Sequence, residues 1–461
     1  MRFLTFLAVS LFLSPGFAQN LSPAADQQLT REIYKELIEI NTSFSTGATT
    51  PAAEAMAARL RVAGFPASDI QVVGAAPHKM NLVVRYRGTG AKRPLLLLAH
   101  LDVVEAKRSD WTFDPFVLHE QDGFFYGRGT SDDKAQAAIW IANLIRYRRE
   151  GFRPSRDLIV ALTADEEGGG PYNGVVWLLE NHRKLLDAEF ALNEGGGGEM
   201  HDSRRLLNLL QVAEKTYADF RIEARNPGGH SAMPVKENAI YRLAAALERI
   251  SRYEFPIRLN EVTRAYFRAT ASLYTGALAE DLQAAARGDQ QAIARVAAAS
   301  PVWNAVLHTT CVATMLDGGH ALNALPQTAG ANINCRVHPD DSLQFVFDTL
   351  RKVIADDKVD VRPSGEPPTS APASPLRDDI LSAAKRVTSQ MWPGVPVVPC
   401  MGTGATDGRF LRAAGIPTYG MTGLFLERDD KRAHGQNERV GVAQFYESET
   451  YLYRLVRELA Q

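Results

Sequence analysis

The chain has little of what disulfide-rich, nucleic-acid-binding or membrane-spanning proteins need. Its three cysteines, Cys311, Cys335 and Cys400, are too few for a scaffold held by disulfides. Lys and Arg (51) nearly balance Asp and Glu (53), giving a net charge of -2, so no basic face is available for nucleic acid or for a membrane surface. After the N-terminal segment, no apolar run approaches membrane-spanning length. The expected partners are therefore small molecules.

Residues 1–18 have the pattern of a secretory signal peptide. One basic residue, Arg2, precedes an apolar segment over residues 3–13, and small residues follow at Gly16 and Ala18. The segment is too short and wrongly flanked for a stable membrane span. We therefore expect cleavage after Ala18 and an exported protein, periplasmic or secreted; a buried N-terminal helix is the alternative.

An exported location would also permit a disulfide. Cys311 and Cys335 lie in two candidate strands of one region of the chain. Oxidising compartments allow such a pair to form a bridge. The sequence leaves two interpretations open, a single bridge between these residues or two buried thiols.

Candidate strands and helices alternate over most of the chain. The apolar runs at residues 95–99 and 158–162 are typical of buried strands, and residues 135–147 between them form a helical pattern with an apolar face. After Gln211 the order becomes strand, helix, strands and helix, and a Pro-rich linker at 363–375 follows. This order predicts an α/β fold in which a helix-flanked mixed sheet carries a smaller, inserted α+β domain. We assign 19–213 and 364–461 to the larger domain and 214–363 to the insertion.

Acidic residues stand where the candidate strands of the larger domain end. His100 and Asp102 follow the first run, and Asp165-Glu166-Glu167 follows the second. Asp132 and Asp133 follow a Gly-punctuated turn before a helix, and Glu194 follows a third short strand. Singly, such groups are more often ion pairs or helix caps. Together they would repel one another strongly unless cations compensate their charge.

His434 adds a second histidine to the group formed by His100 and the carboxylates. Two histidines with several carboxylates suit zinc or a similar divalent ion, and a shared carboxylate allows two ions about 3.5–4 Å apart. One carboxylate must stay free of metal to take the proton from water. Because Glu166 and Glu167 are neighbours, one can bind metal while the other acts as the base.

Six motifs resemble, in order, those of the M20 family of metallopeptidases. They are His100-Leu101-Asp102, Gly127 to Lys134, Asp165-Glu166-Glu167-Gly168, Asn193-Glu194-Gly195-Gly196, Gly228-Gly229-His230-Ser231 and His434 to Arg439. The resemblance extends from about residue 30 to the C-terminus. Six motifs in this order are highly specific for the family and much less specific for the substrate.

The resemblance implies a role for each member of the predicted centre. One zinc would be held by His100, Asp132 and Glu194, and a second by Asp132, Glu167 and His434. Asp132 would bridge the ions, Glu166 would be the general base and Asp102 would orient His100. The peptide bond between Asp132 and Asp133 would be cis.

The family also implies that the inserted domain is a lid that often carries the dimer interface. His230 would support the oxyanion, often from a partner subunit. Asn323, Arg336 and Gly404 match substrate-contact positions, and Arg336 could bind a substrate carboxylate through two hydrogen bonds. A structural ion pair within the lid sheet is the alternative for Arg336.

The sequence thus predicts an exported di-zinc metallopeptidase, with manganese or cobalt as alternative metals. It would hydrolyse the amide bond of small peptides, as a carboxypeptidase or dipeptidase, by metal-activated water with a Glu base. One alternative is a deacylase of N-acyl amino acids, which would use the same metals. A remoter alternative is a non-catalytic metal- or peptide-binding protein. A homodimer through the lid is possible under all of these interpretations.

Overall fold

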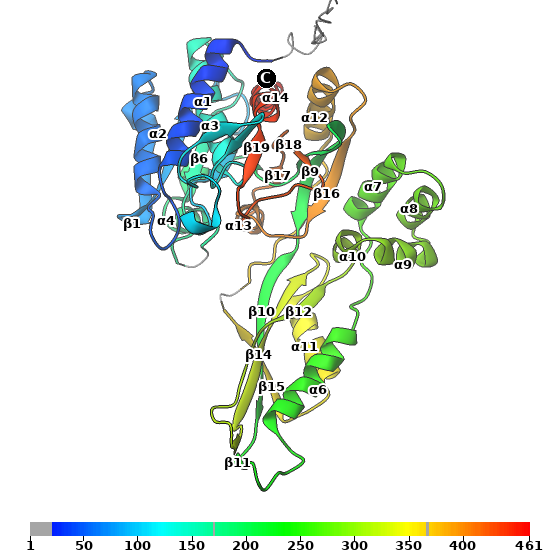
Figure 1. The fold of residues 1–461 in the computed structure, drawn as a ribbon. Coiled ribbons are helices and arrows are strands. Elements are labelled where there is room, and N and C mark those ends of the chain that lie inside the picture. Colours follow the sequence, from blue (N-terminus) through cyan, green and yellow to red (C-terminus); the bar gives the residue numbers. More distant parts are fainter. Residues whose placement is uncertain (1–20, 169–170, 366–367) are drawn as a thin grey trace, which may run out of the picture.

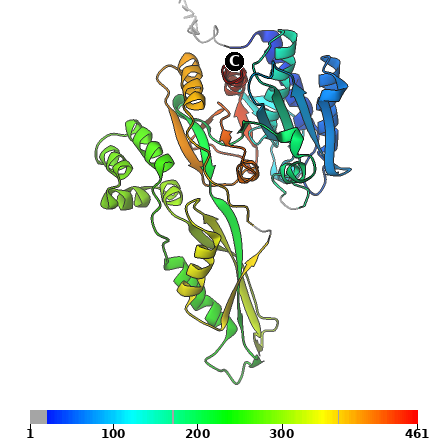
Figure 2. The ribbon, with the colours of Figure 1, turned by 180° about the vertical axis from the view of Figure 1, so that it is seen from behind.

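The computed structural model describes residues 21–168, 171–365 and 368–461. The predicted signal peptide lies outside the described residues. Figures 1 and 2 show a broad larger domain, from which a narrow lid projects in one direction. In the part of the chain that the structure describes, no helix combines the length and the apolar character needed to cross a bilayer.

The larger domain is built on one mixed sheet. Its strand order is β1-β2-β6-β3-β7-β17-β9-β8-β18, with β16 paired to β9. The bounds are β1 Ile70–Ala76, β2 Lys79–Tyr86, β3 Leu95–His100, β6 Leu158–Thr163, β7 Phe190–Asn193, β8 Gly197–His201, β9 Arg204–Glu214, β16 Val397–Gly402, β17 Thr418–Gly420 and β18 Phe425–Glu427. Because β3 runs parallel to both β6 and β7, the carboxyl ends of all three meet at one edge.

Both faces of this sheet are covered, which explains the apolar runs. Leu95, Leu97 and Ala99 of β3 belong to one hydrophobic core, whereas Leu96 and Leu98 belong to a second core on the other face. This alternation follows from the two-residue period of a strand. The covering helices are α1 Ala24–Glu39, α2 Thr50–Val62, α3 Lys134–Arg149, α4 Gly174–Asn181, α5 Arg183–Leu186, α12 Asp378–Met391, α13 Gly408–Ala413 and α14 Val442–Leu459.

A small three-stranded sheet adjoins the motif that carries Asp132. It consists of β4 His119–Gln121, β5 Phe124–Tyr126 and β19 Arg439–Gly441, in the order β19-β5-β4. The pairing of β5 with β19 brings the C-terminal motif of His434 next to the turn that precedes Asp132. Segments about 300 residues apart in the chain thereby meet at the same place.

The lid has a four-stranded sheet with the order β12-β14-β10-β15. Its strands are β10 Thr216–Arg225, β12 Thr310–Gly318, β14 Thr328–Val337 and β15 Val359–Ser364; helices α6 Ala239–Arg252 and α11 Leu343–Ile354 complete its core. The short pair β11 Gly229–His230 and β13 Ala324–Leu325 lies at its far end (Figure 1). This arrangement agrees with the predicted α+β insertion, while the exact domain limits stay a prediction.

Four helices inside the predicted lid span pack elsewhere. They are α7 Glu261–Thr270, α8 Ala277–Arg287, α9 Gln290–Ala299 and α10 Pro301–Leu307, and we call residues 261–307 the helical insert. Val262, Phe267 and Leu307 belong to the core of the larger domain, and the insert stands beside β16 in Figure 1. The predicted limits 214–363 stay a prediction, and within them the helical insert shares its hydrophobic core with the larger domain. The lid sheet is already covered by α6 and α11, so the apolar faces of the insert are buried against the larger domain.

Cys311 and Cys335 are joined by a disulfide. The two residues face each other on the neighbouring antiparallel strands β12 and β14. Cys400, on β16, is a buried free thiol. Of the two interpretations left open by the sequence, the structure has the single bridge.

Candidate metal centre

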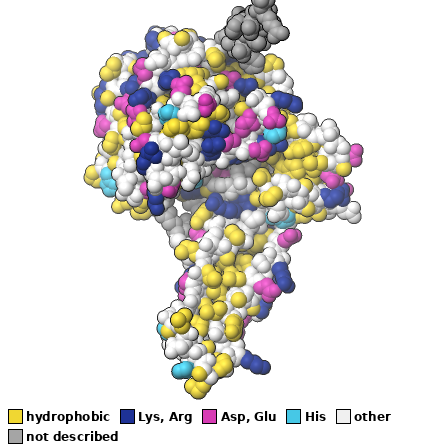
Figure 3. All heavy atoms as spheres, in the orientation of Figure 1, with side chains coloured by type: hydrophobic (Ala, Val, Ile, Leu, Met, Phe, Trp, Pro, Cys, Tyr) yellow, Lys and Arg dark blue, Asp and Glu magenta, His cyan; other side chains and the backbone are white. Residues whose placement is uncertain are grey.

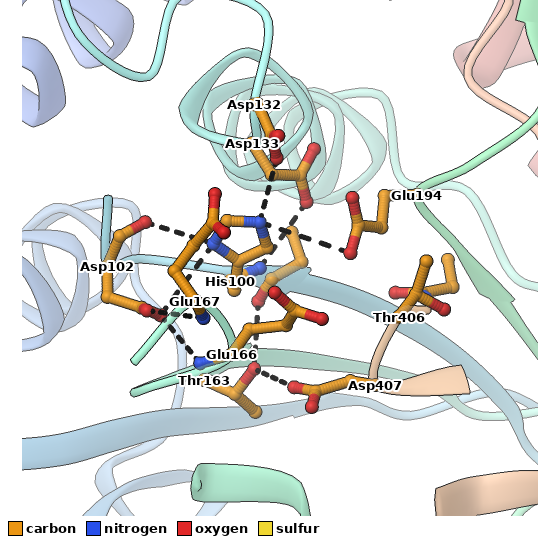
Figure 4. A network of polar contacts seen from close by, with 12 residues as sticks. His100, Asp102, Asp132, Asp133, Thr163, Glu166, Glu167, Glu194, Thr406 and Asp407 are labelled. Atoms are coloured by element: carbon orange, nitrogen blue, oxygen red, sulfur yellow. Dashed lines mark hydrogen bonds and ion pairs between the residues drawn. The ribbon is translucent and has the colours of Figure 1, made fainter. Parts of the chain in front are cut away.

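His100 is the last residue of β3, and its imidazole meets carboxylates from two other segments. Its Nε2 lies 3.0 Å from Oδ1 of Asp132 and 4.0 Å from Oε1 of Glu194. Only 2 % of the His100 side chain is exposed. Figure 4 shows Asp132 and Glu194 converging on this ring from the start of α3 and the end of β7. The shared sheet edge thus collects three of the predicted ligands.

His434 approaches the same centre from the opposite end of the chain. Its Nε2 lies 2.7 Å from Oε1 of Glu167 and 3.1 Å from Oδ2 of Asp132. Asp132 therefore contacts one histidine through each of its carboxylate oxygens. This is the arrangement expected of a ligand shared by two ions.

The donor atoms are close enough to hold metal ions. Ligand atoms of His100, Asp132 and Glu167 lie within 4.8 Å of one another, and so do those of His100, Glu166 and Glu194. Imidazole nitrogens with carboxylate oxygens fit zinc and related divalent ions. All five predicted ligands meet here, and Glu166 lies among them.

Several carboxylates crowd together at the centre, and the pKa values of Glu166 and Glu194 are raised. Burial, followed by the charge of Asp407, raises the pKa of Glu166 well above its usual value. Burial and the charges of Glu166 and Asp132 likewise raise the pKa of Glu194. Hydrogen bonds to Asp132 and Glu167 raise the pKa of His434 to about 10. Divalent ions would relieve this repulsion, so the residues fit the metals that the motifs imply.

Asp102 has a different geometry from the one expected. The His100 Nδ1 atom lies 3.0 Å from the backbone oxygen of Asp102 but 3.7 Å from its carboxylate. That carboxylate instead accepts hydrogen bonds from the backbone N–H groups of Glu166 (3.1 Å) and Glu167 (2.9 Å). Asp102 therefore orients the imidazole through its main chain and the two glutamates through its side chain (Figure 4).

Glu438 is a functional residue to which sequence reasoning gave no role. Its buried carboxylate accepts hydrogen bonds from the N–H groups of Gly129 (3.1 Å), Ser131 (2.8 Å) and Asp132 (3.2 Å), and it pairs with Arg128 at 2.7 Å. The peptide bond that follows Asp132 is cis, as the family resemblance implied. Glu438 thus fixes the turn that presents the shared ligand. The only feature of the sequence that could have identified Glu438 was its position four residues after His434.

Asp407 was also missed. Its carboxylate accepts hydrogen bonds from Asn173 (2.7 Å) and the hydroxyl of Thr163 (3.3 Å), beneath Glu166 in Figure 4. Burial raises the pKa of Asp407 to about 6. It lies at the N-cap of α13, far in sequence from the strand ends, so only folding brings it close to the base.

The predicted lid residues are not gathered at the centre within one chain. His230 is exposed at the far end of the lid, where the Asn323 carbonyl accepts a hydrogen bond from Ser231 N–H (Figure 1). The Arg336 guanidinium lies over the Tyr217 ring at 4.6 Å, and burial and the charge of Arg409 lower its pKa. Gly404 occupies an exposed loop after β16. Their substrate contacts stay predictions.

Replacing Glu438 by glutamine is expected to destabilise the centre and the fold together. The amide would place a donor against the loop N–H groups and would leave the buried Arg128 without a charged partner, a loss of about 3–5 kcal/mol. Denaturant unfolding and elemental analysis should report lower stability and lower metal content. The control is Glu120→Gln, which breaks the exposed pair with Arg31 and should cost under about 1 kcal/mol. Equal losses in both variants would contradict the assigned role.

Comparison with known proteins supplies the family. Residues 96–458 match the model of peptidase family M20/M25/M40. The chain belongs to this family. The M20 fold, with its catalytic and lid domains, is also found among solved structures, and the chain is an enzyme that hydrolyses amide bonds.

Two sequence relatives illustrate the range of the M20 family. The human N-fatty-acyl-amino acid synthase/hydrolase PM20D1 is 29% identical over 79% of this chain and 74% of its own length. The probable carboxypeptidase S-like 2 of Dictyostelium discoideum is 29% identical over 82% of this chain and 74% of its own length.

Two solved M20 structures share the fold. A metallo-carboxypeptidase from Sulfolobus solfataricus superposes with a TM-score of 0.70 at 17% identity, covering 93% of this chain and 98% of the other. A dinuclear metal-binding peptidase from Bacillus subtilis gives a TM-score of 0.61 at 12% identity, covering 95% and 99%. The Bacillus subtilis protein is a dinuclear metal-binding peptidase, and the centre described above contains side chains that could hold metal ions.

Proposed function

We propose that the chain is an exported two-metal amidohydrolase that releases an amino acid from an N-acyl amino acid. The observation that carries this proposal is the meeting of Asp132 with both His100 and His434 beside an unshared glutamate, Glu166. That donor set suits two ions and leaves a base for proton transfer.

The proposed ligands are those that the family motifs imply. His100, Asp132 and Glu194 would hold one ion, and Asp132, Glu167 and His434 would hold the other, with zinc as the proposed metal and manganese or cobalt as alternatives. When bound, the ions would polarise the amide carbonyl and make water more acidic. His230 would support the oxyanion only if it came from a partner subunit.

Glu166 would move the proton. Its carboxylate takes a proton from the attacking water as the carbon–oxygen bond forms, and it gives that proton to the amide nitrogen as the carbon–nitrogen bond breaks. The products are a carboxylic acid and a free amine. Burial and neighbouring carboxylates raise the pKa of Glu166, which favours acceptance of the proton near neutral pH.

The relatives support an acyl substrate over a small peptide. N-fatty-acyl-amino acid hydrolases and aminoacylases recur among the sequence relatives. The carboxypeptidase S-like relative supports the second candidate, a carboxypeptidase or dipeptidase, which sequence analysis had placed first. Arg336 or the loop of Gly404 would bind the free carboxylate in either case.

Turnover of a mixed substrate panel distinguishes the N-acyl amino acid hydrolase from the carboxypeptidase or dipeptidase. Purified enzyme with added zinc or manganese would be assayed against dipeptides, N-acetyl amino acids and long-chain N-acyl amino acids, alongside elemental analysis. The proposal expects a higher kcat/KM for acyl amino acids and two bound ions in each chain. Cleavage of dipeptides alone would establish the second candidate.

Export is supported by the N-terminal pattern and by the disulfide in the lid, since disulfides persist in oxidising compartments. Expression of the full sequence in a bacterial host, followed by N-terminal sequencing of the exported protein, should give a mature chain that starts at Gln19. Retention of the whole chain in the cytoplasm would contradict this part of the proposal.

A homodimer through the lid would complete the site. The strand β12 is an edge of the lid sheet and exposes Val312 (60%), Met315 (70%) and Leu316 (71%). An edge strand with exposed apolar side chains is suited to pairing with another copy. Such pairing could bring His230 of the partner subunit to the metal centre.

Mixing two inactive variants tests this arrangement. His230→Ala should lower kcat about 10²–10³-fold, because an oxyanion donor is lost, and should keep the metal. Mixed dimers of His230→Ala and Glu166→Gln subunits should regain activity, since one of their two sites has both groups intact. His320→Ala, at another exposed lid position, is the matched control. Absence of regained activity in proven mixed dimers would exclude the shared site.

A further inference from the structure

An apolar cavity adjoins the metal centre and has no role in the chemistry described so far. The smaller cavity of the centre, about 240 Å³, is lined by Asp132 and Glu194. A second cavity of about 660 Å³ lies between the sheet and the helical insert. Gly196, Glu199, Leu209 and Lys431 line both cavities, so the two spaces share a wall.

Gly196, two residues after Glu194, belongs to the shared wall. Gly196 has φ +69°, and a Cβ atom there would lie 2.5 Å from the backbone oxygen of Gly420. Only glycine fits this position. At this position the shared wall consists of backbone alone, two residues from the proposed ligand Glu194.

The larger cavity is lined mainly by apolar side chains from two sides. Leu207, Leu209 and Met401 come from β9 and β16, and Leu278, Val302 and Trp303 come from the helical insert. Tyr274 packs edge-on against Trp303 with ring centroids 5.7 Å apart. In Figure 3, hydrophobic side chains gather over the insert where it meets the larger domain. The volume falls within the range of about 300–1,000 Å³ that is usual for ligand sites.

The charged groups of this cavity do not call for a charged ligand. Arg428 pairs with Glu199 at 2.5 Å, and Gln211 donates to Glu214 at 3.3 Å. Lys431 is exposed and lies on the wall shared with the metal centre, at the end where a polar amide would sit. The interior thus favours an uncharged, apolar chain.

We infer that this cavity holds the acyl chain of the substrate, and that the helical insert selects long linear acyl groups. The inference rests on the proposed function. An N-acyl amino acid whose carbonyl lies at the metal centre has its acyl chain attached directly to the reacting carbon. The neighbouring cavity shares a wall with the metal centre and offers an apolar volume that such a chain could fill. A hydrophobic peptide side chain is the competing occupant, and it would fill only a part of the space.

The chain-length profile of hydrolysis tests the inference. N-acetyl, N-butanoyl, N-octanoyl and N-hexadecanoyl leucine would be compared in the wild type and in Val302→Trp, which fills the cavity. Val302 is 57% exposed, so the larger side chain should be tolerated by the fold. Val62→Trp, at a 90% exposed site on α2 outside the cavity, is the matched control.

The wild type and the control should gain up to about fourfold in kcat/KM for each added methylene that is buried. Val302→Trp should lose this gain, so that its ratio of kcat/KM for the octanoyl and hexadecanoyl substrates to that for N-acetyl leucine falls well below the wild-type ratio. An unchanged long-chain profile in Val302→Trp would overturn the inference while leaving the proposed function intact. Cleavage of dipeptides without any N-acyl leucine would instead overturn the proposed function.

A binding measurement gives a readout independent of turnover. Trp303 lines the cavity, so a stearic acid with a spin label near its methyl end should quench the fluorescence of this tryptophan. Glu166→Gln enzyme should retain the quenching, and Trp303→Phe should lose most of it. Equal quenching in Trp303→Phe would mean that the fatty chain binds elsewhere and would contradict the assigned site.

Discussion

Replacing Glu166 by glutamine should lower kcat for amide hydrolysis by about 10²–10⁴-fold, the range of general acid–base catalysis. Glutamine has nearly the same shape, but its side chain cannot take a proton from water at neutral pH. The backbone N–H that Asp102 holds is unchanged by the substitution. The His434 and Asp132 contacts of the centre are also left in place, so the metal content should stay near that of the wild type.

Steady-state kinetics with elemental analysis on the same preparation would check this expectation. Glu180→Gln, which alters an exposed glutamate of α4, is the control and should leave both quantities unchanged. If Glu166→Gln kept wild-type turnover, another group would have to carry the proton. If it lost its metal, Glu166 would be a ligand, as its closeness to His100 and Glu194 would also permit.

Replacing Asp132 by alanine should remove both metal ions and all measurable activity. Its two carboxylate oxygens contact His100 and His434, so no ion of the pair would keep its full ligand set. The turn itself should persist, because the Asp132 N–H and not its side chain is held by Glu438. The variant should therefore fold.

Circular dichroism would establish that the Asp132→Ala protein is folded, and elemental analysis would count its ions. Asp110→Ala, at an exposed position, is the matched control and should bind metal normally. A folded Asp132→Ala protein that retained one ion would show that the ligand sets are separate. Retention of both ions would reject Asp132 as the shared ligand.

The centre was predictable from sequence where local pattern and sheet geometry determine it. His100, Glu167 and Glu194 follow apolar runs that form parallel neighbours, so their closeness follows from the edge that those strands share. His434 was identified only from the motifs, because it lies about 300 residues after Asp132 in the chain. The α/β fold with an inserted α+β unit followed from the same periodic patterns.

Other features depend on contacts that no local pattern records. In the sequence, Glu438 is one of many acidic residues. Only the pairing of β19 with β5 brings its side chain to the loop of Asp132. Asp407 comes near Glu166 only through folding, which places its carboxylate against the hydroxyl of Thr163 at the end of β6. Within the helical insert the sequence shows a polar, Ala-rich helical stretch at residues 280–299, but this composition does not specify which domain the helices cover.

The two hydrogen bonds accepted by Asp102 also bear on how the centre tolerates motion. Its oxygens hold the N–H groups of adjacent residues, so Glu166 and Glu167 are tied to the same support. The separation between the proposed base, Glu166, and the proposed ligand, Glu167, is then set within one dipeptide. If the whole loop shifts by a fraction of an ångström, both side chains travel together and that separation is preserved. Substitutions in surrounding segments should consequently change substrate binding before they change the position of Glu166 relative to Glu167.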